Sequence, residues 1–371
     1  MPRYARMLEQ GMRERGHEVA VCTAKPFFYK LPVPVSVKKW MGYLDQYILF
    51  PIMFKLGRKS ENTLYVFADQ ALGPWIPLVQ NKPHVIHCHD FLAQRSALGE
   101  VEENKTSKTG RWYQHFIRWG YQHGRYFISI SKSTQQDLHR LLQTKPLVSE
   151  VVYNGLNQKF IPGKPFNIRA ELSEELKIDL HSGYILHVGG NQFYKNRIGV
   201  LEIFEAFTAQ TKDSIPLLLI GSIPTKTLLD KKEKMHFKDR VYFLQGLSDE
   251  TLKKIYQGAS VMLYPSLEEG FGWPIAEAHA SGCPVITTHK APMSEVGGDS
   301  VLYVIRRTEK NVDDFINDGV TGLKRVMSWS PQEREDFVNK GLINAKRFET
   351  NHALNEIEKV YKKVYTLHHS L

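Results

Sequence analysis

The sequence predicts an α/β protein that is divided into two domains. Its 371 residues are more than one ordinary hydrophobic core organises, so two domains are expected. Short apolar runs alternate with helical patterns along most of the chain, which is typical of strands connected through helices. Between residues 261 and 288 the order is strand, glycine loop, short helix and strand, which predicts a parallel crossover.

The composition, 42% hydrophobic and 24% charged residues, is that of a soluble globular protein. The three cysteines, Cys22, Cys88 and Cys283, are odd in number and far apart, so we expect no disulfide framework and a cytoplasmic location. The most apolar run, Tyr47 to Phe54, is too short to span a membrane. The net charge of +10 indicates anionic partners such as nucleotide phosphates or acidic lipid. Because no nucleic-acid-binding module is recognisable, we expect no nucleic acid partner.

The first elements are a helix and then a strand. Tyr4 to Arg15 carries its apolar residues on one face, and we predict a helix there; we predict a strand over Glu18 to Ala24. Met1 leads directly into the helix, with no secretory signal before it. A doubly wound domain normally opens with a strand. Either translation starts upstream of Met1, or the protein lacks its first strand.

The segment Val37 to Lys59 mixes aromatic residues with lysines and arginine. Such a mixture can place a segment in a membrane interface. The alternative is a pair of helices packed on the domain with solvated charges. We favour the second interpretation, because the apolar residues are too dense for one clean helical stripe.

Two further strands are predicted at Thr63 to Phe67 and Val85 to His89. The second ends in His87, His89 and Asp90, and strand alternation places the two histidines on one face. A metal site is one interpretation, and a satisfied core histidine is another for His87. His89 and Asp90 stand at the carboxyl end of a strand, where open α/β sheets bind ligands.

The first domain continues with a helix at Arg111 to His123, a strand at Tyr126 to Ile130 and a helix at Thr134 to Leu142, capped by Ser133. An Asn-Gly turn signal followed by two prolines and a glycine predicts the domain linker near residues 154 to 166.

The second domain opens with a strand at Tyr184 to Val188, followed by Gly189 and Gly190. Lys195 and Arg197 then precede an amphipathic helix. A glycine turn, a basic side chain and a helix start together form a phosphate-binding element. The alternative is a loop with solvated basic side chains.

The remaining elements follow the same alternation. Ser248 or Asp249 caps one of the helices. We predict strands at Pro216 to Ile220, Val241 to Leu244, Val261 to Tyr264 and Val285 to Thr288, and helices at Glu250 to Gly258, Pro331 to Arg347 and Asn351 to Tyr365.

Two carboxylates, Glu269 and Glu277, bracket the loop Gly270 to Gly272 and the helix start that follows. Pro274 suits the first turn of a helix, and the N–H groups of Trp273 to Ala276 favour an anion there. A phosphate on the helix start, with hydroxyl-bearing groups accepted by the two glutamates, describes a nucleotide sugar. The plainer alternative is that Glu277 is a surface carboxylate that the helix dipole favours.

The stretch from Glu269 to Glu277, built around GFG and followed by SGCPV, resembles the E-x7-E signature of retaining GT-B glycosyltransferases, in particular glycosyltransferase family 4. The HD pair at His89 and the stretch FISISKSTQQDL resemble the same family. The loop VGGNQFYKN resembles the family's diphosphate-binding loop, with Lys195 matching its lysine. Asn191 stands where the family has an arginine, and Arg197 could take over that role.

The resemblance implies a GT-B fold, in which two Rossmann-like doubly wound domains face a cleft. It implies an acceptor domain at residues 1–160, a donor domain at 161–348 and a last helix, 349–371, that crosses back to the first domain. The implied reaction moves a hexose, with retention, from a GDP- or UDP-linked donor to a saccharide or lipid-linked saccharide acceptor, with no metal or other cofactor. Peripheral contact with the anionic inner face of the membrane stays an open alternative.

The resemblance also implies roles for single residues. Glu269 holds sugar hydroxyls, Glu277 accepts the ribose hydroxyls, Lys195 neutralises the departing diphosphate, and His89 contacts sugar or phosphate. The implied catalytic residues are therefore Glu269, Lys195 and His89. The implied donor-binding residues are Gly189, Gly190, Asn191, Lys195, Arg197, Glu269, Gly270, Phe271, Gly272, Trp273, Pro274 and Glu277.

Three rival functions remain open at this point. A degenerate GT-B protein would bind its ligand without turnover, as the missing first strand and Asn191 suggest. A GT-B epimerase or phosphorylase would use the same fold. A metal hydrolase would use His87, His89 and Asp90.

Overall fold

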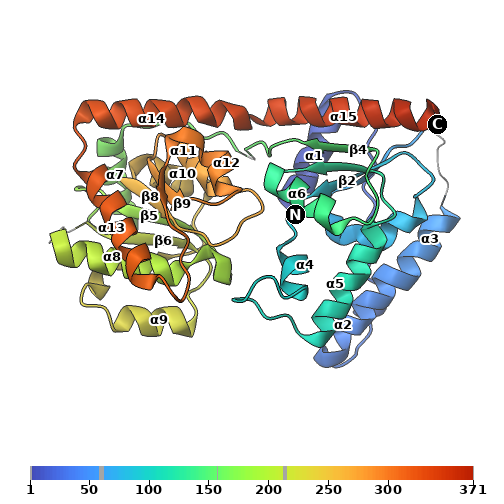
Figure 1. Ribbon diagram of the computed structural model, residues 1–371, viewed down its shortest axis with the longest axis horizontal. Coiled ribbons are helices and arrows are strands. Elements are labelled where there is room, and N and C mark those ends of the chain that lie inside the picture. Colours follow the sequence, from blue (N-terminus) through green and yellow to red (C-terminus); the bar gives the residue numbers. More distant parts are fainter. Residues whose placement is uncertain (1, 58–61, 157, 212–214, 371) are drawn as a thin grey trace. The chain divides into compact units, whose positions relative to one another are not determined.

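The computed structural model describes residues 2–57, 62–156, 158–211 and 215–370 (Figure 1). The chain forms two compact units. Unit 1 comprises residues 1–157 and 350–371, and unit 2 comprises residues 158–349. Each unit is built on its own sheet, in which all strands are parallel. The predicted α/β class with two parallel-sheet domains is therefore confirmed.

The sheet of unit 1 has the order β1-β2-β3-β4. Its strands are β1 (Tyr65–Phe67), β2 (His84–Cys88), β3 (Tyr126–Ser129) and β4 (Val148–Val151). Every residue of β2 and β3 is buried, which explains why their sequences are continuous apolar runs rather than alternating ones. The strands β1, β2 and β3 overlap predicted strands, and β4 was not predicted.

Helices cover both faces of this sheet. On one face, α1 (Pro2–Glu14) and α15 (Thr350–Ser370) contribute Leu8, Met12 and Leu354 to a core with Val85 and Ile128. The other face packs against η3 (Gln70–Leu78), α5 (Lys108–Tyr121) and α6 (Lys132–Leu141). The short helix α4 (Leu92–Ala97) contacts α5.

The packing of η3 on α5 depends on two glycines. A Cβ atom on Gly120 would lie 2.1 Å from the carbonyl carbon of Gly73, and one on Gly73 would lie 2.2 Å from the carbonyl oxygen of Ile117. Both clashes are with backbone, which cannot rotate away. The two elements therefore approach as closely as they do because neither residue has a side chain.

The predicted strand at Glu18 to Ala24 is wrong, because the structure has irregular backbone there, with Val21 59% exposed. The described residues before β1 form helices and irregular chain but no strand. Alternation of apolar residues is not sufficient for a strand, since the backbone groups also need a neighbouring strand to pair with. Within the described residues β1 pairs only with β2, so nothing in the sheet pairs with this segment.

A second correction concerns the start of α6. Ser131, rather than the predicted Ser133, is the N-cap residue, and its hydroxyl accepts a hydrogen bond from the N–H of Thr134 at 3.0 Å. Both serines fit the residue preference for this position. Only the extended backbone of Ser131 identifies it as the cap.

The segment predicted as a helix pair consists of α2 (Val35–Leu44), the π-helical turn η2 (Asp45–Leu49) and α3 (Phe50–Leu56). Pro51 lies in the first turn of α3. Arg58 and Lys59, the last residues of the predicted segment, lie outside the described residues. A short 3-10 turn, η1 (Phe28–Lys30), precedes α2.

The sheet of unit 2 has the order β10-β9-β8-β5-β6-β7. After β5 the chain adds β6 and β7 on one side of that strand, and then β8, β9 and β10 on its other side. Its strands are β5 (Ile185–Gly189), β6 (Leu217–Gly221), β7 (Val241–Leu244), β8 (Val261–Tyr264), β9 (Val285–Thr288) and β10 (Leu302–Val304). Five of these overlap predicted strands, and β10 was not predicted.

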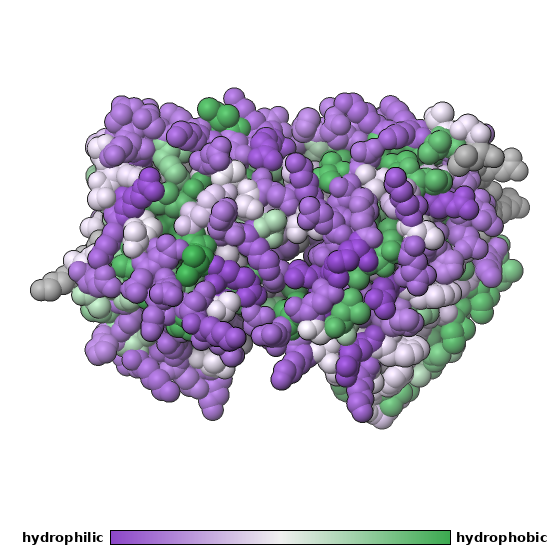
Figure 2. Space-filling view, viewed as in Figure 1, coloured by the Kyte–Doolittle hydropathy of each residue, from purple (hydrophilic) through white to green (hydrophobic). Residues whose placement is uncertain are grey.

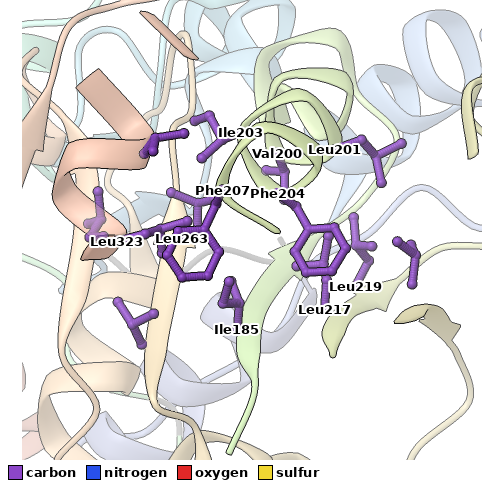
Figure 3. Packing of buried hydrophobic residues seen from close by; sticks show 14 of the residues in the cluster. Ile185, Val200, Leu201, Ile203, Phe204, Phe207, Leu217, Leu219, Leu263 and Leu323 are labelled. Carbon is purple, nitrogen blue, oxygen red and sulfur yellow. The ribbon is translucent and has the colours of Figure 1, made fainter. Parts of the chain in front are cut away.

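The main core of unit 2 lies between this sheet and α8 (Arg197–Thr211) with α13 (Val312–Met327). Figure 3 shows Phe204 and Phe207 of α8 packed against Ile185, Leu217 and Leu263 of the sheet. The other helices of the unit are α7 (Pro165–Leu176), α9 (Lys226–Glu233), α10 (Asp249–Gly258), α11 (Trp273–Ala280), α12 (Met293–Gly297) and α14 (Pro331–Ala345). Of these, α11 packs on β8, β9 and α14.

Candidate functional site

Two loops of unit 2 emerge at the same edge of the sheet. The first follows β5 and contains η4 (Phe193–Lys195), and the second runs from β8 to α11. Because β5 and β8 are adjacent parallel strands, their carboxyl ends lie side by side. This edge, where the strand order reverses, is where open α/β sheets bind ligands.

The two loops are joined by backbone and side-chain hydrogen bonds. The N–H of Leu267 donates to the carbonyl of Tyr194 at 2.7 Å, and the Asn196 amide donates to the carbonyl of Pro265 at 2.9 Å. Asn196 has the left-handed backbone conformation, with φ of 50°, which asparagine tolerates better than most residues. The geometry of one loop therefore fixes the geometry of the other.

Lys195 and Glu269 meet at the centre of this junction, although they are 74 residues apart in sequence. The Lys195 ammonium donates to Glu269 Oε1 at 2.7 Å and to the Tyr264 hydroxyl at 2.7 Å. The Tyr264 hydroxyl donates to the same carboxylate oxygen at 2.5 Å. Side-chain exposure is 14% for Lys195 and 8% for Glu269, so the pair is largely withdrawn from water.

Burial, and then the Glu269 charge, raise the pKa of Tyr264 well above its ordinary value. Tyr264 is therefore a permanently neutral donor that orients the carboxylate. Sequence reasoning missed Tyr264, because its role depends on which residues the fold brings to the end of β8.

Glu277, the second predicted carboxylate, lies on α11. Its Oε2 accepts a hydrogen bond from the Tyr256 hydroxyl at 2.8 Å. Burial, and then Glu277, raise the pKa of Tyr256 well above its ordinary value, so this hydroxyl also remains a donor. Gly272 precedes the helix with φ of 101°, and no side chain caps the helix start.

Glu268, the residue before Glu269, is a buried acid that sequence reasoning did not single out. Its carboxylate contacts the ammonium of Lys290 and lies 3.7 Å from the guanidinium of Arg306. Two cations thus compensate Glu268 separately. Because of this separate pairing, Lys195 is the cation that neutralises Glu269.

Arg197, the residue predicted to substitute for the missing arginine, is buried in the structure. The residue is 4% exposed, and its Nη1 donates to Asn191 Oδ1 at 2.5 Å and to the carbonyl of Ser222 at 3.2 Å. Its Nε and Nη2 have no hydrogen-bond partner among the described residues. Burial lowers the pKa of Arg197 to about 10. Arg197 holds Asn191 in place, and neither residue takes part in the hydrogen bond between Lys195 and Glu269.

The glycines of this loop are crowded by their neighbours. A Cβ atom on Gly189 would lie 3.2 Å from Cδ of Lys195, and one on Gly190 would lie 2.4 Å from Oε1 of Gln192. A side chain at Gly189 would therefore push against the residue that carries the ammonium group, whereas one at Gly190 would push against Gln192.

The histidines of unit 1 have internal partners. His87 is fully buried, its Nδ1 lies 2.8 Å from the Tyr4 hydroxyl, and its Nε2 lies 2.7 Å from the Tyr361 hydroxyl. Burial lowers the pKa of His87 to about 3. His89 is 5% exposed, and its Nε2 lies 2.8 Å from the carbonyl of Ala68. His89 belongs to the other unit and is not part of the Lys195–Glu269 contact.

These contacts bear on the metal-site interpretation. Both ring nitrogens of His87 are engaged by tyrosine hydroxyls, so neither is available to a metal. Asp90 Oδ1 accepts the N–H of Leu92 at 3.0 Å, at the start of α4. Among the residues that the structure describes, no group of three or more His, Cys, Asp or Glu side chains could hold a metal ion.

A lysine, a carboxylate and an uncapped helix start at the carboxyl edge of a parallel sheet are features typical of nucleotide-binding α/β units. Comparison with known protein families identifies the family to which the chain belongs. Residues 1–160 match the family described as Glycosyltransferase Family 4, and residues 168–328 match Glycosyl transferases group 1. The chain belongs to these glycosyltransferases, which confirms the predicted family.

Two sequence relatives illustrate the similarity. The chain is 30% identical over 182 residues to the O-antigen chain mannosyltransferase B of Escherichia coli, a match that covers 48% of this chain and 46% of that protein. It is 23% identical to the O-antigen chain mannosyltransferase RfbU of Salmonella typhimurium, over 66% of this chain and 62% of that one. The matches thus span about half and somewhat under two thirds of these two relatives.

Solved structures share the fold. The sucrose-phosphate synthase of Thermosynechococcus elongatus superposes with a TM-score of 0.70 at 17% identity, over 98% of this chain and 93% of that one. WaaG, a glycosyltransferase involved in lipopolysaccharide biosynthesis, gives 0.69 at 16% identity, over 93% and 91%. Anabaena HepE in complex with UDP and glucose gives 0.65 at 16% identity, over 86% and 83%. The predicted GT-B fold is confirmed by these likenesses.

Proposed function

We propose that this protein is a retaining glycosyltransferase that moves a hexose from a nucleotide diphosphate sugar to a hydroxyl of a saccharide or lipid-linked saccharide. The observation that carries the proposal is the contact of Lys195 with Glu269 beside the uncapped start of α11. The family assignment supports the reaction class. The names of the mannosyltransferase relatives, and the UDP bound in a structural neighbour, support a hexose donor linked to GDP or UDP.

The reaction requires the site to stabilise the leaving group. Cleavage of the sugar–phosphate bond places negative charge on the departing nucleoside diphosphate, and fixed positive groups lower the energy of that charge. Lys195 supplies an ammonium group, and the N–H groups at the start of α11 supply the positive end of a helix dipole. The fold places these groups at one edge of the sheet before the donor arrives.

The two glutamates are proposed to hold the two polyol parts of the donor. Glu269 would accept sugar hydroxyls, and Glu277, on the next helix, would accept ribose hydroxyls. Each carboxylate already accepts a hydrogen bond from a neutral tyrosine, Tyr264 or Tyr256, which fixes its orientation. His89 is proposed to contact the donor from unit 1, through the part of its ring that does not bond Ala68.

A panel of GDP- and UDP-linked hexoses tests the proposal, with release of nucleoside diphosphate measured in the presence of saccharide and lipid-linked acceptors. We expect release with one donor class, dependent on acceptor, and an anomeric configuration in the product that matches the donor. Absence of nucleoside diphosphate binding by calorimetry would refute the site. An inverted product would refute the retaining mechanism.

The second candidate is a degenerate GT-B protein that binds the donor without transferring the sugar. One observation favours it. The Arg197 guanidinium is buried and bonded to Asn191, so of these two basic residues Lys195 is the one that contacts Glu269. The same panel separates the two candidates. Tight donor binding with no release under any acceptor would support the degenerate protein.

A further inference from the structure

Unit 1 carries an apolar surface formed by α2, η2, α3 and α5, which we call the α2–α5 surface. The segment from α2 to α3 is rich in Trp, Tyr, Phe, Ile, Leu and Met, yet none of these side chains is fully buried, and Asp45 is the buried residue. Amphipathic helices normally bury their apolar stripe against the domain that carries them. Here much of the apolar area remains uncovered.

The exposed fractions are large for side chains of this kind. Val35 is 88% exposed, Leu56 is 82% exposed and Trp112 of α5 is 69% exposed, and Trp40, Ile52 and Trp119 are each more than 40% exposed. Figure 2 shows hydrophobic surface along the edge where Figure 1 draws α2 and α3. Contiguous apolar patches of this kind usually mark an interaction site.

Ring contacts join α5 to α2 and η2. Tyr43 stacks on Tyr113 with centroids 5.6 Å apart, and Tyr47 meets Phe116 edge-on at 5.3 Å. Phe116 in turn stacks on Trp112 at 5.9 Å. The aromatic side chains of the two segments therefore form one continuous surface.

Apart from Asp45, the charged residues of residues 25–57 and of α5 are all basic. The acid of the segment, Asp45, is turned inward, where its carboxylate accepts the N–H groups of Phe27, Phe28 and Tyr29 at 2.8 to 3.1 Å. The α5 helix contains no acid. The cations of residues 25–57 and of α5 are Lys25, Lys30, Lys38, Lys39, Lys55, Lys108, Arg111 and Arg118.

We propose that the α2–α5 surface docks on an anionic lipid bilayer, with Trp40, Leu56 and Trp112 entering the interfacial region and the lysines and arginines contacting lipid phosphates. Tryptophan and aliphatic side chains within a cationic rim suit the interface of an anionic membrane. Lipid phosphates would complement the lysines and arginines of these segments. None of the helices among the described residues combines the length and hydropathy of a membrane span. This inference does not rest on the proposed function, although it would bring a lipid-linked acceptor to the enzyme.

The proposal is tested by flotation of the full chain with two kinds of phosphatidylcholine vesicle. One kind contains about 30% phosphatidylglycerol, enough to make its surface strongly negative, and the other contains none. We expect binding to the anionic vesicles that weakens as salt is raised, because salt screens surface charge. The combined variant K39E, K55E and R111E should weaken this binding by about 100-fold or more, since each cation contributes roughly a factor of five. The variant W112S with L56S should weaken it by about 10-fold or more.

A matched control carries the same charge change elsewhere. The variant K226E, K234E and K310E reverses three exposed lysines of unit 2 and should retain most of the binding. Equal loss in the control would show attraction by net charge alone and would overturn the proposal. Binding to neutral vesicles that ignores salt would also overturn it. Self-association that the W112S and L56S variant abolishes, without vesicle binding by the parent chain, would assign the surface to a second copy instead.

These measurements are independent of glycosyl transfer. Nucleoside diphosphate affinity, measured by calorimetry, should be unchanged in the surface variants, because Lys195, Glu269 and Glu277 lie in unit 2. A failure of vesicle binding with intact nucleotide binding would therefore reject the membrane contact and leave the proposed function standing.

Discussion

Lys195 is the residue whose removal should affect the reaction most directly. Its ammonium lies 2.7 Å from Glu269, and we propose that it neutralises the departing diphosphate. We expect Lys195→Ala to reduce kcat by about 100-fold or more, because electrostatic stabilisation of the departing diphosphate would be lost. Steady-state rates on the best donor measure the effect, with Lys234→Ala, an exposed lysine of the same unit, as the control. A near-normal kcat would remove Lys195 from the mechanism.

Glu277 is expected to act on binding rather than on turnover. Glu277→Ala should cost about 1–3 kcal/mol of nucleoside diphosphate affinity, the range for a lost hydrogen bond to a charged group. Tyr256→Phe removes the hydroxyl that donates to this carboxylate and should have a smaller effect in the same direction. Calorimetric titration of both variants measures the two effects. Unchanged affinity in Glu277→Ala would exclude a ribose contact.

The residues of the candidate site were predictable where their chemistry depends on sequence spacing. Glu269, the GFG loop and Glu277 lie within one loop and one helix turn, so a sequence pattern describes them. Tyr264, Tyr256 and Glu268 were not predicted, because their roles depend on partners that only the fold brings near. Whether the predicted residues bind the donor stays a proposal.

At the scale of secondary-structure elements, the contact of η3 with α5 offers a sharp test. Replacing glycine by alanine within a helix normally stabilises a protein by up to about 1 kcal/mol. Gly120→Ala should do the reverse and destabilise by about 1–3 kcal/mol, because its Cβ atom would lie 2.1 Å from the backbone of Gly73. In Gly322→Ala of α13 the nearest atom is 3.4 Å away, so that variant should be neutral or stabilising. Urea unfolding compares the two, and equal stabilities would contradict the close approach.

The elements that the sequence predicted correctly are those with a local signal. Buried strands such as β2 and β8 are continuous apolar runs, and Ser248 was one of two caps considered for α10, where its hydroxyl accepts the Thr251 N–H at 3.0 Å. The segment Glu18 to Ala24 has the same local signal as a strand but lacks a pairing neighbour. Pairing is a tertiary property that a single stretch of sequence does not contain.

At the scale of the whole molecule, buried histidines make the folded state sensitive to acid. Burial lowers the pKa of His87 to about 3, whereas an unfolded histidine has its ordinary pKa near 6.5. Between these values the unfolded chain binds a proton that the folded chain does not, so the free energy of unfolding falls as the pH falls below about 6.5. His187 and His279, with pKa values of about 3 and 4, act in the same direction in unit 2.

The contribution of His87 can be isolated. From pH 6.5 to 5.0 one such histidine changes the free energy of unfolding by about 2 kcal/mol. His87→Gln keeps polar groups near Tyr4 and Tyr361 but does not titrate, so its stability should fall less steeply over this interval. Urea unfolding at several pH values, with the exposed His236→Gln as a control, measures the slopes. Parallel slopes for parent and His87→Gln would contradict the assignment.

The contact of Lys195 with Glu269 also affects which compounds can bind at this site. Two opposite charges that already satisfy each other are separated at little cost only when each finds a new partner at the same time. An intact nucleotide sugar brings both partners, since it has an anion for the lysine and hydroxyls for the acid. Free hexose would give a new partner to Glu269 alone, and inorganic phosphate would give one to Lys195 alone. We therefore expect such fragments to compete poorly with the intact donor.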